Sequence, residues 1–350
     1  MNKEIVKETL KNQQLDIILF FSPENRFWMT DFASSLGYLF TTSQENYLFV
    51  DGRYFTAAQS LAKNCQVYLW KSVEDIKKFL EKLQIEKIGF EKEHITIAQW
   101  EKWQKQMPNF QWIGVETSKL RIIKTKEEIE RIRQAAKITD QTYQKLLKEV
   151  KTGMREKDLA KIIFNSFEEL GAEGVSFETI VASGKRGALP HGQASEKIIQ
   201  EGELITVDFG CKYQGYCSDF TRTFALGKKI NLKLQEIYQI VQQAQEKGIK
   251  SVKVGIKCSE IDQIVRNYIQ EKGYGEYFIH STGHGLGIEV HEEPGISTKD
   301  ETILQPGMII TIEPGIYLPH LGGVRIEDDI LITENGCELL TKSPRELIYI

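Results

Sequence analysis

Two nine-residue segments of this chain follow one pattern, Gly-x-[Leu/Ile]-Ile-Thr-[Val/Ile]-[Asp/Glu]-x-Gly, and each holds one carboxylate inside an apolar run. The first segment spans residues 202–210 and contains Asp208; the second spans 307–315 and contains Glu313. A carboxylate half buried in a strand destabilises the folded state by several kcal/mol unless it has a cationic partner. Each segment therefore predicts a nearby positive charge.

A second carboxylate follows the first segment after a short loop. Asp208 and Asp219 lie symmetrically about residues 213 and 214. If those two residues form the turn of a hairpin, the aspartates face each other directly, with Cβ atoms about 4.5–5.5 Å apart. Two carboxylates that close cannot both stay ionised unless they share a cation. The pair is therefore typical of a metal site.

The second segment repeats this arrangement, because Glu313 and Glu327 lie symmetrically about His320. Four carboxylates in two matching settings indicate one shared cation site. The alternative interpretation is that they are ordinary ion-pair partners of Arg222 and Arg325.

Histidines gather in the same part of the chain: five of the six lie between residues 191 and 320. His191 and His291 occupy comparable places relative to the two segments, whereas His284 has no counterpart. Glycines on both sides of His284 exclude a regular helix there, so His280 and His284 are not a helical zinc pair. One cation position would then have an imidazole ligand and the other only oxygen ligands. A hydrogen-bonded structural role stays open for His280 and His320.

The elements that must position these residues also repeat. From about residue 120, apolar periodicity predicts two helices followed by the strands of the first segment, and the same plan then recurs with the second segment. Lys151–Arg155 opens the second helix of one half, and Lys253–Lys257 opens that of the other. The helices are expected at 126–150, 156–170, 232–247 and 259–272, with the last three ending at glycines 171, 248 and 273. This pattern predicts an α+β domain with an internal pseudo-twofold repeat.

The first 118 residues alternate strand-like and helical runs instead, which is typical of a small α/β domain. Ser72 with Asp75 predicts the start of a helix. Strands are expected at 16–20, 47–50, 67–70 and 87–90.

Composition narrows the class of protein. A net charge of −4 over 350 residues gives no electrostatic reason to expect nucleic acid or an anionic membrane as a partner. The apolar run 17–21 is far too short to span a bilayer, and the amino terminus lacks a signal core. Five cysteines without a Cys-x-x-Cys motif argue against a disulfide framework and fit a cytoplasmic location. Cys211 and Cys217 are better interpreted as small strand residues than as metal ligands.

These residues resemble the signature blocks of the pita-bread metallopeptidases, and the aminopeptidase P / prolidase branch is the most similar. The blocks that carry the resemblance are Val207–Gly210, Ser218–Thr223, Gly283–Gly285, His291–Glu292, Ile312–Gly315 and Gly323–Asp328. The likeness covers nearly the whole chain. It implies a creatinase-like N-terminal domain over 1–118, a linker over 119–126 and a pita-bread catalytic domain over 127–350.

The resemblance also implies a dinuclear metal centre. In that family pattern Asp208 binds one divalent ion, His284 and Glu313 bind the other, and Asp219 and Glu327 bridge the two. Four carboxylates and one imidazole favour Mn(II), with Co(II) or Zn(II) able to substitute.

Catalytic roles follow from the same resemblance. Glu313 would carry a proton to the leaving nitrogen, and His191 and His291 would hydrogen-bond the substrate and the developing oxyanion. His280 would line a proline pocket, and Arg325 would orient a metal ligand or hold a substrate carboxylate.

The expected activity is hydrolysis of the bond between an N-terminal residue and proline by a cytoplasmic homodimer acting on proline-containing peptides, with no nucleic acid or membrane involved. The sequence favours an Xaa-Pro aminopeptidase, and the alternative is a prolidase restricted to Xaa-Pro dipeptides. A methionine aminopeptidase-like enzyme, a creatinase and a non-catalytic peptide-binding module are the remaining alternatives.

Overall fold

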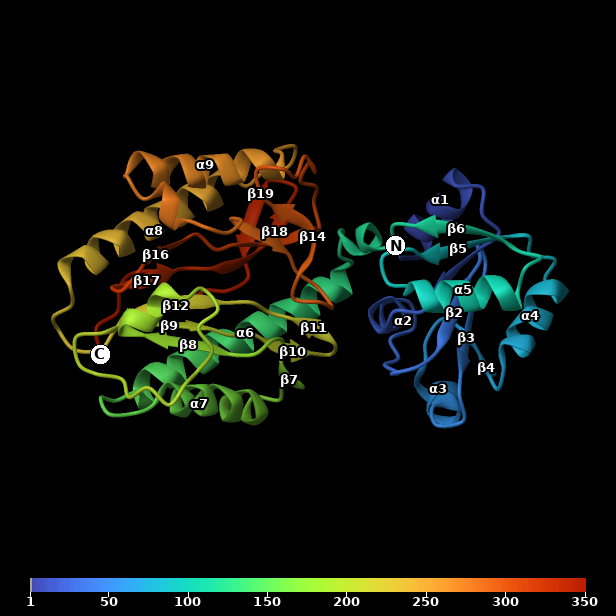
Figure 1. Cartoon of the computed structure of the whole chain (residues 1–350), viewed down its shortest axis with the longest axis horizontal. Coiled ribbons are helices and arrows are strands. Elements are labelled where there is room, and N and C mark those ends of the chain that lie inside the picture. The colour runs from blue at the N-terminus through green and yellow to red at the C-terminus, as the bar shows by residue number, and fades with distance from the viewer. Residues whose placement is uncertain (1) are drawn as a thin grey trace. The chain divides into compact units, whose positions relative to one another are not determined.

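The computed structural model describes residues 2–350 and divides into two compact units, Met1–Arg121 and Ile122–Ile350 (Figure 1). Each unit has its own apolar core. Among residues 2–350, no helix is both long enough and apolar enough to cross a membrane.

The first unit is a six-stranded mixed sheet with helices packed against it. The four strands expected from the sequence are present, and β2 and β6 complete the sheet. The capping box of Ser72 and Asp75 starts α4, as predicted. In pairing order the strands are β4 (Gln66–Leu69), β3 (Asn46–Val50), β2 (Tyr38–Thr41), β1 (Ile17–Phe20), β5 (Lys87–Glu91) and β6 (Gln111–Val115). The helices are α1 (Asn2–Asn12), α2 (Pro23–Thr30), α3 (Phe55–Leu61), α4 (Val73–Lys82) and α5 (Ile97–Gln106).

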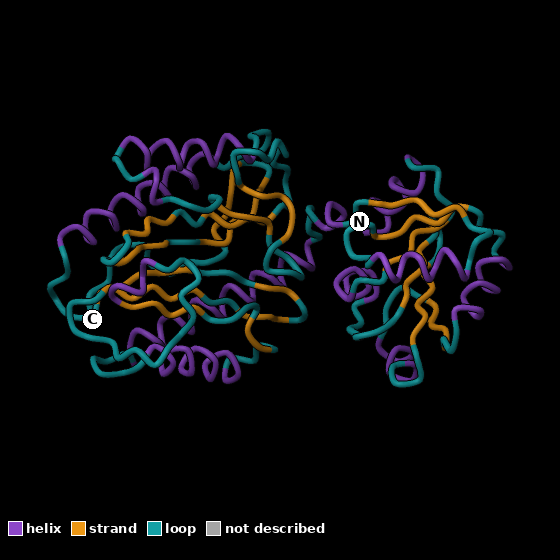
Figure 2. The backbone as a smooth tube through the Cα atoms, viewed as in Figure 1, coloured by secondary structure: helices purple, strands orange, loops and turns teal. Residues whose placement is uncertain are grey.

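The second unit is built from two similar halves, which confirms the predicted internal repeat. Each half contributes a helix pair and three antiparallel strands that pair in the same order, β8-β9-β12 and β13-β15-β18. Figure 2 shows these strands between the two helix pairs. The helices are α6 (Lys126–Glu149), α7 (Glu156–Glu169), α8 (Leu232–Ser251) and α9 (Cys258–Glu271). The strands of the first half are β7 (Gly174–Val175), β8 (Ile180–Ser183), β9 (Leu204–Asp208), β10 (Cys211–Tyr213), β11 (Tyr216–Cys217) and β12 (Thr221–Ala225). Those of the second half are β13 (Gly283–Gly285), β14 (Glu292–Ile296), β15 (Ile309–Ile312), β16 (Gly315–Leu318), β17 (Gly322–Arg325), β18 (Asp328–Thr333) and β19 (Gly336–Leu339).

An aromatic core under the first half decides which way Asp208 points. Tyr143 and Phe167, on the helices, pack with Phe209 and Phe220 on the strand side, and all four are buried. Burial of each ring stabilises the fold by roughly 1.5–3 kcal/mol. Because successive side chains along a strand point to opposite faces, Phe209 enters this core while Asp208 faces away from it.

The hairpin after Asp208 turns one residue later than predicted. Tyr213 pairs with Tyr216, so the turn lies at Gln214 and Gly215, whose φ angles are 47° and 78°. Positive φ at both positions is the conformation that matches the twist of a two-residue hairpin, and Gly215 adopts it without strain. Asp208 therefore pairs with Thr221. The prediction that the two aspartates face each other directly is wrong; Asp219 lies two residues before the position opposite Asp208.

The second pair of carboxylates has the predicted register. Ile312 pairs with Asp328 and Gly315 with Arg325 on either side of Glu313 and Glu327. Both glutamates therefore lie at matching positions about His320, as the sequence indicated.

Helix α8 does not end at Gly248, contrary to the prediction, but continues to Ser251. Gly248 lies where α8 packs against α9 and β15. A Cβ at this position would lie 2.8 Å from Val265 Cγ2 on α9 and 3.1 Å from Ile312 Cγ2 on β15. The glycine thus allows close packing of a helix against a strand that leads directly to Glu313.

Replacing Gly248 by alanine is expected to lower the free energy of unfolding by about 1–3 kcal/mol, because the added methyl group overpacks this contact. The effect opposes the intrinsic helix preference for alanine, which alone would stabilise by roughly 1 kcal/mol. Chemical denaturation measures the change. Gln239→Ala, on the exposed side of the same helix, is the matched control. Equal or greater stability of Gly248→Ala would contradict this account of the packing.

Candidate metal centre

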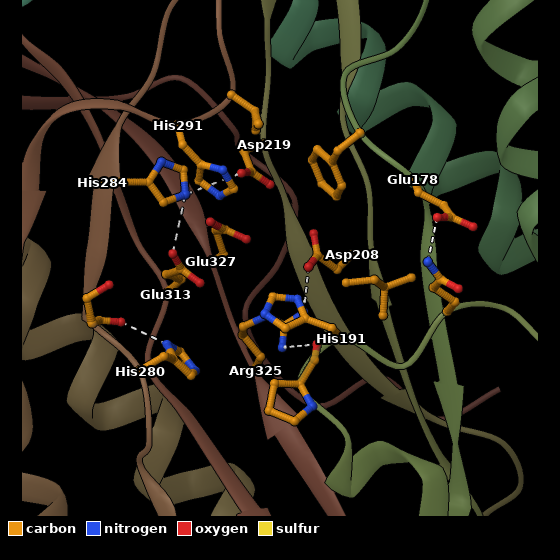
Figure 3. A pocket seen from close by; sticks show the side chains of 16 residues that line it. Glu178, His191, Asp208, Asp219, His280, His284, His291, Glu313, Arg325 and Glu327 are labelled. Carbon is orange, nitrogen blue, oxygen red and sulfur yellow. Dashed lines mark hydrogen bonds and ion pairs between the residues drawn. The ribbon is translucent and has the colours of Figure 1, made fainter. Parts of the chain in front are cut away.

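A pocket of about 520 Å³ in the second unit brings together every site residue predicted from the sequence. Figure 3 shows the carboxylates at its centre, with histidines around them. The predicted residues that line it are Asp208, Asp219, Glu313, Glu327, His191, His280, His284, His291 and Arg325.

The pocket forms where strands of the two halves end. Asp208 is the last residue of β9, and Glu313 directly follows β15. Asp219 and Glu327 lie in the short connections that precede β12 and β18. The repeated topology therefore delivers two carboxylates from each half to one place.

Glycines on both sides of His284 set its position. A Cβ at Gly283 would lie 2.0 Å from the Thr311 carbonyl oxygen, and one at Gly285 would lie 2.3 Å from the Glu293 carbonyl oxygen. Only glycine allows β13 to fit between its neighbouring strands, β14 and β15. This close approach carries the imidazole of His284 to the carboxylates.

The His284 ring is oriented to accept a metal ion. Its Nδ1 lies 2.9 Å from the backbone carbonyl oxygen of Gly285, which fixes the proton on that nitrogen and leaves the Nε2 lone pair free. The Nε2 atom lies 3.4 Å from Glu313 Oε1 and 3.6 Å from Asp219 Oδ2. One ligand atom each from Asp219, His284 and Glu327 lie within 4.8 Å of one another.

Three carboxylate oxygens in this cluster are buried and have no hydrogen-bond partner among the described residues. They belong to Asp208 (Oδ1), Asp219 (Oδ1) and Glu327 (Oε1). A buried, unpaired anionic oxygen is costly, and a cation removes that cost. The donor set of carboxylates and one neutral imidazole therefore fits divalent metal ions.

The electrostatics of the cluster support the same conclusion. Burial, followed by repulsion from neighbouring carboxylates, raises the pKa of Asp219 and Glu327 well above its ordinary value. Burial raises the pKa of Glu313 to about 8. Burial, and then the neighbouring His291, lower the pKa of His284 to about 4, so its ring is neutral at pH 7 and can bind a metal.

Among the described residues, Arg325 is the one lysine or arginine that forms an ion pair with any of these four carboxylates. Its Nη2 lies 2.5 Å from Asp208 Oδ2, and its Nε donates to the hydroxyl of Thr221, which in turn donates to Glu327 Oε2 at 2.7 Å. The ion-pair interpretation thus holds for Asp208 alone. Arg222 pairs with Asp328 at 2.7 Å instead.

The sequence did not reveal three residues that support the centre. Thr311 accepts a hydrogen bond from the His284 backbone NH, and Asp329 accepts one from that of Asp219. Thr311 lies two residues before Glu313, so strand alternation could have placed it on the same face. No sequence pattern pointed to Tyr317. Its hydroxyl lies 2.7 Å from Arg325 Nη1 and 2.9 Å from His280 Nε2.

A buried carboxylate also fixes each of two histidine loops. Glu156 accepts hydrogen bonds from Ser183 and Ser195, at the two ends of the loop that carries His191. Asp262 accepts two from Thr282, just beyond His280. The second helix of each half, α7 or α9, therefore fixes one of these loops by hydrogen bonds from its carboxylate.

This arrangement is a candidate site for divalent metal ions in a two-half α+β domain. Residues 130–334 match the model of metallopeptidase family M24, and residues 4–123 match that of the creatinase/prolidase N-terminal domain. The chain belongs to metallopeptidase family M24, whose members use divalent metal ions, and it has the pita-bread fold expected from the sequence.

Three relatives illustrate the similarity. An Xaa-Pro dipeptidase of Pyrococcus horikoshii is 42% identical, with 99% of each chain covered. The structure of an Xaa-Pro dipeptidase from Bacillus anthracis has a TM-score of 0.95 at 40% identity, covering 100% of this chain and 99% of the other. That of an X-Pro aminopeptidase from Thermotoga maritima has a TM-score of 0.92 at 34% identity, with both chains fully covered.

The metal-free protein is expected to lose stability as the pH rises from about 6.5 to 8. Folding raises the pKa of Glu313 from 4.5 to about 8, so this group holds more protons in the folded state over this interval. His280, His284 and His291, whose pKa values burial lowers from 6.5, are largely neutral in both states there and do not oppose the effect. Asp219 and Glu327 act in the same direction. Melting temperatures in chelator and in saturating Mn(II) measure the effect.

Added metal should remove this decline, because the cation compensates the ionised carboxylates. Glu313→Gln, which cannot ionise, should reduce the decline in chelator and serves as the control. A metal-free protein whose stability rises over this interval would contradict the described electrostatics.

Proposed function

We propose that this chain is an Xaa-Pro peptidase that hydrolyses the bond between an N-terminal residue and proline. The observation that carries the proposal is the set of unpartnered carboxylate oxygens in a pocket that His191, His280, His284 and His291 also line. The relatives described above, which are named for Xaa-Pro substrates, support the same activity.

The metal ligands are proposed residue by residue. Asp208 would hold one ion, His284 and Glu313 the other, and Asp219 and Glu327 would contact both. Mn(II) suits this oxygen-rich set. When bound, such ions acidify a water molecule to serve as the nucleophile and polarise the scissile carbonyl.

The protein side chains supply orientation and proton transfer. Glu313 takes the proton of the attacking water and passes it to the proline nitrogen, which must be protonated to leave. Burial lowers the pKa of His291, so its neutral ring donates a hydrogen bond to the developing oxyanion without bringing another full charge. His191 contacts the substrate from the other half, and Arg325 keeps Asp208 in place through their ion pair.

His280 would form part of the proline pocket. Burial, and then the nearby Arg325, lower its pKa to about 4. A neutral ring tethered to the Tyr317 hydroxyl presents a flat, rigid surface suited to the pyrrolidine ring.

Two activities are supported equally by the relatives: an Xaa-Pro aminopeptidase, as the sequence favours, and an Xaa-Pro dipeptidase. Hydrolysis of Ala-Pro and Ala-Pro-Ala-Ala by the Mn(II)-loaded protein, with identification of products, separates them. Alanine released from the longer peptide indicates the aminopeptidase, and cleavage of the dipeptide alone indicates the dipeptidase. Metal binding without turnover of either peptide would favour a non-catalytic binding module.

The proposal also covers the domain boundaries, the oligomeric state and the cellular location of the enzyme. We propose a catalytic domain over residues 127–350 that is joined by the linker 119–126 to the N-terminal domain 1–118, in a cytoplasmic homodimer. Light scattering on the purified protein tests the dimer.

Replacing Asp219 by asparagine is expected to abolish hydrolysis and to weaken metal binding at both positions. The substitution removes a negative charge and one potential ligand oxygen while keeping the side-chain shape. Calorimetric titration with Mn(II) and assays on Ala-Pro and Ala-Pro-Ala-Ala measure both properties. An active Asp219→Asn enzyme would refute the shared-ligand assignment.

Replacing His291 by alanine is expected to leave metal content unchanged and to lower kcat by about 100-fold or more, as loss of one oxyanion donor does elsewhere. Metal analysis and steady-state kinetics distinguish the two effects. Loss of metal from His291→Ala would reassign this histidine as a ligand.

A further inference from the structure

The two sides of the pocket differ in charge. On one side lies Glu178, which is hydrogen-bonded to Gln193; Gln193 pairs with Ile180, and Phe177 precedes Glu178 in the chain. On the opposite side lies His280, which also lines an adjoining hollow that contains the exposed Lys299. Arg266 lines the same hollow, but its guanidinium is paired with Asp262. Figure 3 shows Glu178 and His280 on opposite sides of Asp208. The cleft thus has the Glu178 carboxylate at one end, and Lys299 lies in the hollow that adjoins the other.

This polarity orients an Xaa-Pro peptide, so the inference rests on the proposed function. A dipeptide carries an ammonium group at one end and a carboxylate at the other. The carboxylate is repelled by Glu178 and attracted by Lys299, because unlike charges attract even across a partly solvated cleft. The side chain of the first residue therefore faces the wall that contains Glu178.

Two contacts fix the position of the Glu178 carboxylate in this wall, which consists of Phe177, Glu178, Ile180 and Gln193. Glu178 Oε2 accepts a hydrogen bond from Gln193 Nε2 at 2.5 Å, and Gln193 itself pairs with Ile180 of β8 through a β-bridge. Glu178 is exposed, so its charge remains available to a substrate.

The rest of the wall is apolar. Ile180 is buried, and Phe177, next to Glu178 in the chain, is partly buried. An apolar surface followed by a carboxylate matches a side chain with an aliphatic stem and a cationic head, the chemistry of lysine and arginine.

We propose that Glu178 is a specificity-determining residue and that the enzyme prefers a cationic first residue. Glu178 acts on substrate choice rather than on the chemical step, since it lies at the wall and contacts none of the proposed metal ligands through a described hydrogen bond or ion pair.

The test compares kcat/KM for Lys-Pro with that for norleucine-Pro, which has a similar length but no charge; the corresponding Xaa-Pro-Ala-Ala peptides are used if only the longer substrates are cleaved. The wild-type enzyme should favour lysine by about threefold to fivefold, as expected for a solvent-exposed ion pair. Glu178→Gln should remove this preference, because kcat/KM for Lys-Pro should fall to that for norleucine-Pro. Glu178→Lys should invert it, and raised salt should weaken it in the wild type.

Glu168→Gln, which removes an exposed charge from α7 outside the pocket, is the matched control and should keep the wild-type ratio. A wild-type melting temperature and Mn(II) content report that each variant is folded. An unchanged lysine preference in Glu178→Gln, or no preference in the wild type, would overturn the inference while leaving the proposed function intact. Failure to cleave any Xaa-Pro peptide would instead overturn the proposed function.

Discussion

Repulsion among buried carboxylates is the constraint on which the second unit depends. Asp219, Glu313 and Glu327 lie where burial raises the pKa of each, and three oxygens of the cluster have no hydrogen-bond partner among the described residues. Such a group of anions is unfavourable by itself. The remaining structure must hold it together until a divalent cation converts the repulsion into attraction.

The repeated architecture supplies that support. Each half places carboxylates at the ends of strands whose opposite faces are fixed by apolar cores, so the charged ends cannot separate without breaking the packing. Close approaches at Gly248 and Gly283 bring α8 and β13 against β15, the strand that leads to Glu313. Interiors packed this densely respond to small displacements with large energetic costs, which keeps the ligand atoms in register.

The sequence predicted the repeat, all four carboxylates and the four histidines of the pocket, because repeated motifs and polar residues in apolar runs are visible without coordinates. The predicted turn was wrong by one residue because symmetry of the two aspartates was used to place it, whereas Gly215 was the better signal: a two-residue hairpin needs positive φ, which glycine adopts without strain. Gly248 was misassigned because a glycine that ends a helix and one that allows close packing look alike in sequence. The wall containing Phe177 and Glu178 lies in a connection without periodicity, so only the folded chain places it beside the carboxylates.

The ion pair with Arg325 distinguishes Asp208 from the other carboxylates of the centre. One oxygen of Asp208 is bound to the guanidinium, and the other is unpartnered. Asp208 thus has a compensating charge before any metal binds, whereas Glu327 accepts a hydrogen bond from the neutral Thr221 hydroxyl and the Asp219 Oδ1 atom has no partner among the described residues. Because Thr221 and Tyr317 hold the same guanidinium, Arg325 also ties the first half to the second. A fixed internal cation of this kind preserves the shape of the site without occupying the space that His284 and the unpartnered oxygens leave for divalent ions.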